Sequence, residues 1–476
     1  MIDKKEKLEK LSKKLWNFYF KKIKKSLYVI TNDYGRYLLL NEKEFSNFLD
    51  LKFTKKIEKD LEKNYFFKKN NFNEAVDLYR KKYDFLNYWT KRHIVVLTLR
   101  CNHNCLYCHA SSNSETNKDT DMNLDTAKNV LNTIINSPSN EITIEFQWWE
   151  PLLNWEILKF FIIEWIKKSK EKNKKLFFSL VSNFSMMDDE KLDFLIGNNV
   201  SFSTSLDWPE FLHNKNRIFT KWNSFSKTVF WIKKINELYL DKWIKKRVFA
   251  ILTLTKESLK YYKEIVDAYI EIGLDSIFVK SINPYWNAKS KLFYSSNEFW
   301  KFYKNILNYI ISLNEKGIKI KENMTYIYLN KIFRDYDPWY LDERSPCWAC
   351  IWQLAYNYNW RIYSCDEWRM LSKMWYEDFF VADTNDWKDT FEKIVNSPTT
   401  KIMIQASTID WLPWYKDDAY KPYTWTCPIY NFIKTWNIYP NYSKDERRKI
   451  SNIILDYIFI NMKNKKKNEI LRSWLN

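Results

Sequence analysis

Apolar and polar residues follow a regular alternation through the middle of the chain, and this pattern predicts strands that alternate with helices. Short apolar runs typical of buried strands cover residues 93–99, 142–146, 176–182, 200–206, 247–254 and 276–282. Most of them are separated by stretches of helical periodicity, such as 124–135 and 257–272. Repeated strand–helix units build a parallel sheet with right-handed crossovers. Because six strands within about 190 residues suit a partial barrel better than a closed eight-stranded one, we predict an α/β fold built on a partial (β/α)6 TIM-like barrel.

The regions that flank this barrel have different patterns. Residues 1–90 combine a basic, helix-like start, a strand pair that turns at Gly35, and helical segments, and we expect a small N-terminal domain. The barrel is expected to span 91–320, with its active groups just after the C-terminal ends of the strands. Residues 321–440 break into short aromatic segments that carry the remaining cysteines, and 441–476 read as a basic helix that caps the fold.

Composition and charge narrow the class of protein. The chain has 476 residues, of which 46% are hydrophobic and 28% charged, as in globular proteins. No apolar run approaches the roughly 18 residues of a membrane span, and the start lacks the pattern of a secretory signal, so we expect a cytoplasmic protein without membrane contact. The net charge of +19 would attract an acidic partner such as nucleic acid. The charge is spread along the chain without a compact Arg/aromatic patch, so a generally Lys-rich composition is the favoured explanation of the net charge.

The chain holds 24 tryptophans and only 4 glycines. Tryptophan also stands where glycine chemistry is expected: Trp360 lies in an Asn-Trp hairpin turn that needs a positive φ, and Trp208 lies in an Asp-Trp-Pro turn. We therefore hypothesise that most tryptophans are glycines in the organism, encoded by UGA codons that it reads as glycine. With glycine at these positions the glycine content would be ordinary.

Three cysteines follow the first predicted strand of the barrel with C-x3-C-x2-C spacing. Cys101, Cys105 and Cys108 can converge on one metal centre, and three ligands would leave one iron of a [4Fe–4S] cluster open for another ligand. A zinc site with His103 or His109 as the fourth ligand is the alternative. A disulfide framework is not expected in a cytoplasmic chain of this size.

This cysteine loop after the first strand of a βα barrel resembles the signature of the radical SAM superfamily. The resemblance implies that Cys101, Cys105 and Cys108 hold a [4Fe–4S] cluster whose open iron chelates S-adenosylmethionine (SAM). One electron then cleaves SAM to a 5′-deoxyadenosyl radical, which abstracts hydrogen from the substrate. In this family the aromatic residue of the loop, here Tyr107, lies against the adenine.

The stretch "QWWEP" resembles the family's Gly-Gly-Glu-Pro segment after the second strand. Trp148 and Trp149 then stand at the two glycines that open the backbone to the SAM amino group, and Glu150 binds that group. The alternative is an exposed glutamate that caps the next helix. Positions that contact the SAM carboxylate or ribose in the family are matched by Asn183, Ser205 and Asp207; turn capping is the alternative for each.

The second set of cysteines resembles the SPASM extension of peptide-modifying radical SAM enzymes. That pattern begins C-x9-G-x4-C, which Cys350, Trp360 and Cys365 fit if Trp360 is glycine. The later cysteine quartet of the pattern survives here only as Cys427. The resemblance therefore implies one complete auxiliary [4Fe–4S] cluster and loss of a second. The set of four ligands is Cys347, Cys350, Cys365 and Cys427, and a zinc site that uses Cys347 and Cys350 is the alternative.

Two carboxylates follow Cys365 directly. In sulfatase-maturing relatives an aspartate at the position of Asp366 accepts a proton as the substrate radical is oxidised, and Glu367 is the neighbouring candidate. Either residue would need burial to bring its pKa toward the working pH. A surface carboxylate without a catalytic role is the alternative.

Taken with glycine for tryptophan, the motifs look most like the His-Xaa-Ser system radical SAM maturases. The resemblance implies modification of a ribosomally made precursor peptide, a second radical SAM maturase as partner, a flavodoxin or ferredoxin as electron donor, and peptide docking by residues 1–90. A sulfatase-maturating, formylglycine-generating enzyme is the alternative within the class. Two alternatives lie outside this class of enzyme. One is a metal-stabilised nucleic-acid-binding protein, and the other is an inactive scaffold whose SAM pocket is filled by genuine tryptophans.

Overall fold

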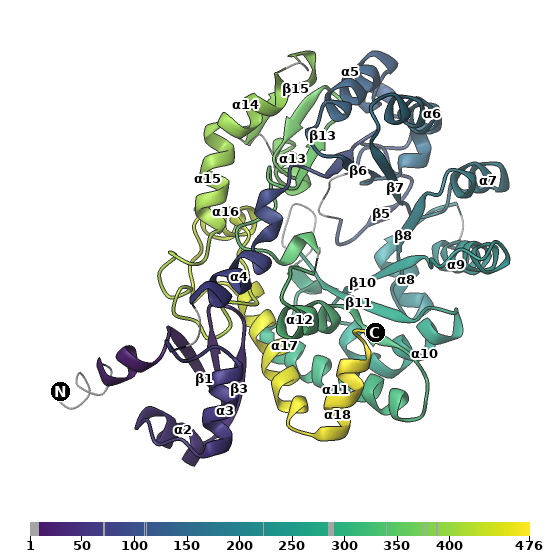
Figure 1. The fold of residues 1–476 in the computed structure, drawn as a ribbon. Coiled ribbons are helices and arrows are strands. Elements are labelled where there is room, and N and C mark those ends of the chain that lie inside the picture. Colours follow the sequence, from purple (N-terminus) through teal and green to yellow (C-terminus); the bar gives the residue numbers. More distant parts are fainter. Residues whose placement is uncertain are drawn as a thin grey trace.

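The fold centres on the parallel sheet that the sequence predicts (Figure 1). The computed structural model describes residues 9–476 apart from 70, 71, 109, 111, 222, 284–289, 339, 375, 378, 387 and 388. All six predicted strands form, as β4 (Arg92–Val95), β6 (Glu141–Phe146), β7 (Lys175–Val181), β8 (Ser201–Ser205), β10 (Phe249–Leu254) and β11 (Ser276–Ser281). They pair in parallel in the order β11-β10-β8-β7-β6-β4. The predicted α/β fold is therefore confirmed.

Helices connect these strands and lie along the outer side of the sheet (Figure 1). They are α5 (Leu124–Ile135), α6 (Trp155–Glu171), α7 (Asp189–Gly197), α8 (Glu210–Asn216), α9 (Ser224–Asp241), α10 (Tyr262–Glu271) and α11 (Ser296–Glu315). On α6 the buried residues include Leu158, Phe161, Ile162 and Trp165, the i, i+3, i+4, i+7 spacing of an apolar stripe. This stripe packs in the main hydrophobic core, together with side chains of the strands such as Ile144.

The central sheet is longer than the sequence predicts, because the C-terminal extension adds strands to it. The strand β13 (Gln353–Tyr356) pairs in parallel with β4 and forms a hairpin with β14 (Arg361–Tyr363), and β15 (Phe380–Asp383) pairs antiparallel with β14. At the other edge β12 (Lys321–Glu322) joins β11. Every residue of β13 is buried, so the strand lacks the alternation that identifies a half-buried strand from sequence. The barrel and the extension thus share one ten-stranded sheet.

The N-terminal unit contains the predicted hairpin and one further strand. The strands β1 (Phe18–Lys24), β2 (Leu27–Asn32) and β3 (Tyr37–Asn41) form an antiparallel sheet, and Gly35 between β2 and β3 has a φ of 78°. Three helices follow, α2 (Glu42–Leu49), α3 (Lys55–Lys63) and α4 (Phe72–Lys82). The unit has its own apolar cluster, which includes Phe48, Leu61 and Phe66.

The C-terminal third is helical around the added strands. Its helices are α12 (Asn323–Phe333), α13 (Asp366–Ser372), α14 (Thr390–Asn396), α15 (Pro398–Ser407), α16 (Pro428–Thr435), α17 (Glu446–Met462) and α18 (Lys465–Ser473). The segment predicted as one basic helix therefore forms two helices. Because α17 buries Leu455, Ile458 and Phe459 in the main core and packs against α11, it is an integral part of the fold. Among the described residues, no helix is long and apolar enough to cross a membrane.

Tryptophans are concentrated at backbone positions that favour glycine. Twelve described non-glycine residues have a positive φ, and six of them are tryptophans. The predicted positive φ of Trp360 is confirmed at 64°, whereas Trp208 is not among these residues. The other five are Trp148, Trp149, Trp243, Trp414 and Trp436. A side chain in this left-handed region costs on the order of 1–2 kcal/mol, so these turns are built for residues without a Cβ.

Glycine in place of Trp243 should therefore stabilise the protein. Trp243 has a φ of 55° and its side chain is 93% exposed, so little packing is lost with the indole. We expect the Trp243→Gly variant to gain about 0.5–1 kcal/mol in free energy of unfolding, measured by denaturant titration.

Trp89 provides a matched control, because it is 50% exposed and is not among the described residues with a positive φ. There the added freedom of the unfolded chain should dominate, and Trp89→Gly should lose about 0.5–1 kcal/mol. Equal effects of the two substitutions would contradict the argument from backbone strain.

Candidate active site

The predicted site residues lie at the C-terminal ends of neighbouring strands. The chain leaves β4, β6, β7 and β8 toward the same edge of the sheet, because these strands are parallel and adjacent. Asn183, which follows β7, reaches the cysteine loop after β4: its Nδ2 lies 3.9 Å from the Cys101 Sγ and 3.0 Å from the Asn102 Oδ1. The fold thus joins segments about 80 residues apart, as the strand-end argument expects.

Arg100, next to the first cysteine, anchors the loop. Its guanidinium contacts both carboxylate oxygens of Asp121, at 2.7 and 2.5 Å, and donates to the Leu153 carbonyl at 2.8 Å. The Arg100 carbonyl also accepts a hydrogen bond from the Glu150 amide at 3.1 Å. A buried bidentate pair of this kind holds a fixed geometry. Arg100, fixed in this way, therefore links the cysteine loop to the segment that contains Glu150 and Leu153.

The three cysteines of the loop form an electrostatically coupled group. Burial, followed by the neighbouring Cys105 thiol, raises the pKa of Cys101 well above its ordinary value of 9.0. Burial raises the pKa of Cys105 to about 11; the charge of Arg217 opposes this shift, and Cys108 adds to it. Cys101 and Cys108 pack in one apolar cluster and Cys105 in another, and buried thiols such as Cys101 and Cys105 become thiolates only when cationic charge compensates them. This donor set therefore fits a metal centre.

His103 does not support the zinc alternative. Its Nε2 contacts the Ser224 hydroxyl at 2.8 Å, its Nδ1 contacts the Asn102 Oδ1 at 3.1 Å, and its ring stacks on Phe219. Both ring nitrogens are thus engaged away from the thiols. The other candidate, His109, lies outside the described residues.

Glu150 is fully buried at this edge. Its Oε1 accepts hydrogen bonds from the Ser182 hydroxyl (2.8 Å) and the Leu152 amide (3.1 Å), and its Oε2 accepts one from the Asn183 amide (2.9 Å). Burial raises the pKa of this carboxyl to about 7, while the Asn183 and Ser182 hydrogen bonds pull it down. The residue does cap the short 3-10 helix at 151–154, but it is not an exposed cap. Glu150 forms no ion pair among the described residues, and a buried carboxylate of this kind favours a positively charged ligand.

Trp148 and Trp149 precede Glu150 with φ values of 77° and 55°. The Trp149 indole is largely buried beneath the Arg369 guanidinium, whose centre lies 4.4 Å from the ring. It packs in one apolar cluster with Cys101 and Cys108. The Trp149 Nε1 and the Arg369 Nε and Nη2 have no hydrogen-bond partner among the described residues. The indole therefore fills the space between the cysteine loop and α13.

Tyr107 and Asp207 are in direct contact. The Tyr107 hydroxyl donates to the Asp207 Oδ2 at 2.7 Å and accepts from Arg217 at 3.1 Å. Burial raises the pKa of Asp207 to about 6, and the Arg217 charge opposes the shift. Arg217 was not predicted from the sequence as a site residue. The only hint in the sequence was its position in the short segment after Asp207. Ser205, the last residue of β8, is half-buried beside this group of residues.

Three of the four remaining cysteines are gathered in a separate apolar cluster, namely Cys347, Cys365 and Cys427. Burial raises the pKa of each thiol, and the nearby Glu367 carboxylate contributes to all three shifts. Cys350 packs in the main core instead, with Ser364 and Thr400 as the partners of its thiol. Its amide still donates to the Ser364 carbonyl at 3.1 Å. Because Cys347 and Cys350 lie in different clusters, a four-cysteine centre and a zinc site on that pair would both need a change in the Cys350 side chain.

Asp366 and Glu367 lie beside the Cys365 thiol, all three ligand atoms being within 4.8 Å of one another. Asp366 is only 5% exposed and accepts a hydrogen bond from the Gln353 amide at 3.1 Å. Burial, followed by the adjacent Glu367 charge, raises the pKa of Asp366 well above its ordinary value of 3.8. The burial that a proton-transfer role would require is therefore present at Asp366.

The pKa of Glu150 predicts a pH-dependent stability difference between the wild type and the Glu150→Gln variant. As pH rises from about 4.5 to about 7, the unfolded state releases the Glu150 proton while the folded state retains it, so wild-type stability falls. Gln does not titrate. In denaturant titrations of metal-free protein, the variant should gain about 2–3 kcal/mol on the wild type between pH 5 and pH 8. The altered hydrogen bonds of Gln shift both values equally, so a pH-independent difference would contradict the burial argument.

Comparison with known proteins assigns a family to this region. Residues 95–269 match the family model described as the radical SAM superfamily. A cysteine-type anaerobic sulfatase-maturating enzyme of Clostridium perfringens is 24% identical over 312 residues, which are 60% of this chain and 78% of that protein. An uncharacterised protein of Methanocaldococcus jannaschii is 25% identical over 240 residues, 50% of this chain and 79% of its own length.

Solved structures share the fold over most of the chain. The enzyme anSMEcpe, solved with bound AdoMet, has a TM-score of 0.63 at 16% identity, over 81% of this chain and 98% of that one. SuiB of Streptococcus suis, solved with the precursor peptide SuiA, has a TM-score of 0.52 at 14% identity, over 88% and 96% of the two chains. Residues 95–269 thus match the radical SAM superfamily and lie in an α/β fold whose mostly parallel sheet a cysteine-containing extension continues.

Proposed function

We propose that the chain is a radical SAM enzyme that modifies a ribosomally made precursor peptide. The observation that carries the proposal is that the three-cysteine loop, the buried Glu150 and the Tyr107–Asp207 pair lie at one edge of the sheet, within the segment that matches the family. These residues supply a metal-ligating group, a carboxylate for an amine and polar groups for a nucleoside. A nucleic-acid-binding protein would leave the buried carboxylates without a role.

The residues present fit the cofactors of this family. When bound, the [4Fe–4S] cluster supplies the electron that cleaves SAM to a hydrogen-abstracting 5′-deoxyadenosyl radical. Cys101, Cys105 and Cys108 would hold this cluster and leave one iron open. Glu150, which is fully buried and forms no ion pair among the described residues, would bind the SAM amino group. Asn183, Ser205 and Asp207 would orient the carboxylate and ribose, and Tyr107 would lie against the adenine.

The extension would hold one auxiliary [4Fe–4S] cluster on Cys347, Cys350, Cys365 and Cys427. Three of these thiols share one apolar cluster. The Cys350 amide already donates to the carbonyl of Ser364, the residue before Cys365, so a change of side-chain rotamer would bring the Cys350 thiol to the other three. Asp366, buried beside Cys365, would accept a proton as the substrate is oxidised.

The proposed activity requires glycine at the two positions before Glu150. The positive φ of Trp148 and Trp149, the orphaned polar atoms of Trp149 and Arg369, and the indole that fills the space beside Cys101 and Cys108 all support glycine there. Recoded UGA codons account for the same bias at the four other strained tryptophans. The codons at 148, 149 and 360 should then be UGA, and peptide mapping of protein from the native organism should find glycine; UGG codons would contradict this.

The substrate we favour is a peptide with His-Xaa-Ser repeats, with residues 1–90 in the docking role, a second radical SAM maturase as partner and a flavodoxin or ferredoxin as electron donor. Cytoplasmic conditions would keep the seven thiols reduced for cluster assembly. SuiB, a structural relative, was solved with a precursor peptide, which supports a peptide substrate for this chain.

A sulfatase-maturating activity is the second candidate. Its support is the sequence likeness over 60% of the chain to a cysteine-type anaerobic sulfatase-maturating enzyme. Such an enzyme would convert a Ser or Cys of a sulfatase peptide to formylglycine. Mass spectrometry after incubation with a His-Xaa-Ser repeat peptide or a sulfatase-derived peptide distinguishes the two candidates, since each predicts modification of only one peptide.

Reconstitution of the Trp148→Gly/Trp149→Gly protein tests the proposed chemistry. Under anaerobic conditions it should bind about eight irons, as two [4Fe–4S] clusters require, and should form 5′-deoxyadenosine on reduction with SAM. The protein that retains both indoles should bind SAM at least tenfold more weakly, because Trp149 fills the space beside the cysteine loop.

A Trp89→Gly variant is the matched control, since Trp89 is half-exposed and is not part of the proposed site. It should behave like the protein with both indoles in place. Equal SAM affinity with and without the two indoles, or one zinc in place of iron, would refute the proposal.

A further inference from the structure

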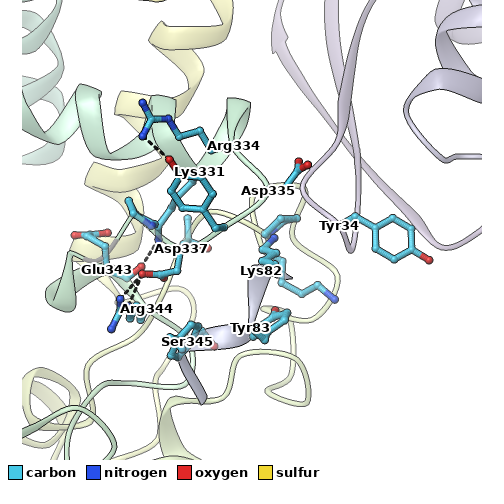
Figure 2. Close-up of a pocket in the computed structure, with 16 residues that line it drawn as sticks. Tyr34, Lys82, Tyr83, Lys331, Arg334, Asp335, Asp337, Glu343, Arg344 and Ser345 are labelled. Carbon is cyan, nitrogen blue, oxygen red and sulfur yellow. Dashed lines mark hydrogen bonds and ion pairs between the residues drawn. The ribbon is translucent and has the colours of Figure 1, made fainter. Parts of the chain in front are cut away.

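A small cavity lies between the N-terminal unit and the C-terminal extension, next to the apolar cluster of Cys347, Cys365 and Cys427, with which it shares Phe85. Its volume is about 40 Å³. Figure 2 shows Lys82 and Tyr83 of the N-terminal unit near Lys331, Glu343 and Arg344 of the extension. This space admits a group the size of a carboxylate or a few water molecules, but not a peptide segment.

The residues that line the cavity carry an excess of positive charge. Five of them are basic and three are acidic. Two of the acids are already paired: Asp335 with Arg36 at 2.7 Å, and Asp337 with Arg344 at 2.7 Å. The carboxylate of the third, Glu343, accepts a hydrogen bond from a tyrosine hydroxyl at 2.9 Å. Two further acids whose charges reach Lys82, Asp33 and Asp410, are both paired with Lys421, at 2.6 and 3.1 Å.

Two of the three lysines at the cavity have acceptors. The Lys331 amine donates to the Tyr423 carbonyl at 2.8 Å, and the Lys421 amine contacts the Asp33 carboxylate at 2.6 Å. The Lys82 amine is screened from solvent although its stem is partly exposed, and it has no hydrogen-bond partner among the described residues.

The Lys82 amine is held in a position that the N-terminal hairpin helps to create. It lies 3.1 Å from the place that a Cβ at Gly35 would occupy, so the glycine that turns the hairpin also leaves room for the amine. Burial, followed by the Lys331 charge, lowers the pKa of Lys82 to about 7. A buried amine without an acceptor is costly unless an anion completes the site.

We propose that this cavity binds a carboxylate group, supplied by an acidic residue of the peptide substrate, with Lys82 as the ammonium that pairs with it. The choice of a peptide rests on the proposed function, because the cavity joins the unit expected to dock the peptide to the extension that carries the auxiliary cysteines. A free small carboxylate is the other source of the same chemistry. Charge-assisted pairing in a screened site would make Lys82 the main determinant of binding.

Thermal unfolding of the full chain with acetate as the probe tests the site. At constant ionic strength set with chloride, acetate at 100 mM should raise the Tm of the wild type by about 2 °C, since a ligand that binds only the folded state stabilises it. The Lys82→Met variant should lose this rise. Its Tm without acetate should equal or exceed that of the wild type, because Met fills the same space without an unpaired amine.

Lys81→Met is the matched control, because Lys81 is the exposed neighbour on the same helix. It should keep the full acetate response. The Lys82→Arg variant, which retains a positive charge, should keep part of that response. No acetate response in the wild type, or the same response in Lys82→Met, would overturn the site.

The source of the carboxylate is tested with two short peptides, acetyl-Ala-Asp-Ala-amide and its Asn counterpart. The Asp peptide should raise the wild-type Tm and the Asn peptide should not; equal responses would overturn the peptide assignment. These measurements need neither iron nor SAM. Their failure therefore stays distinct from failure to form 5′-deoxyadenosine, which would refute the proposed function itself.

Discussion

The parallel, sequence-ordered pairing of β4, β6, β7 and β8 is the constraint on which the site depends. Parallel strands leave the sheet at one edge, so the loops that contain Cys101, Glu150, Asn183 and Asp207 meet there although they are far apart in the chain. Arg100, paired with Asp121, then joins the first two of these loops through the Leu153 carbonyl and the Glu150 amide. A register change in any of these strands would separate the thiols from the carboxylates.

Burial of charge gives this edge its chemical character. Glu150 and Asp207 both lie out of contact with water, and desolvation raises the pKa values of both. Burial of these carboxylates therefore lowers the folding stability, and binding of a cationic ligand would offset that loss, as is common at functional sites. Arg217 moderates this cost at Asp207 through the Tyr107 hydroxyl. At Glu150 the compensation is three hydrogen-bond donors, with the Arg217 charge as the smallest contribution.

The tryptophans oppose this otherwise consistent design. A sequence that specifies one fold has local conformational preferences that agree with the tertiary structure, yet six indoles stand at left-handed positions. Trp243, almost fully exposed, gains nothing from packing there, and Trp149 fills space beside the cysteine loop. Other tryptophans, such as Trp165, are fully buried in the core. In the described part of the chain the conflict therefore falls at turns and at the site, where a missing Cβ matters most.

The sequence alone determined the six strands, their parallel pairing and the cysteine loop, because apolar periodicity and ligand spacing are local properties that a single chain displays. It also predicted the positive φ of Trp360. Only the tertiary structure decided that β13 continues the barrel sheet, that Arg217 supports Asp207, and that Cys350 packs in a different cluster from the other three thiols. The cavity at Lys82 was equally hidden. Each of these features depends on contacts between distant segments, which no local pattern encodes.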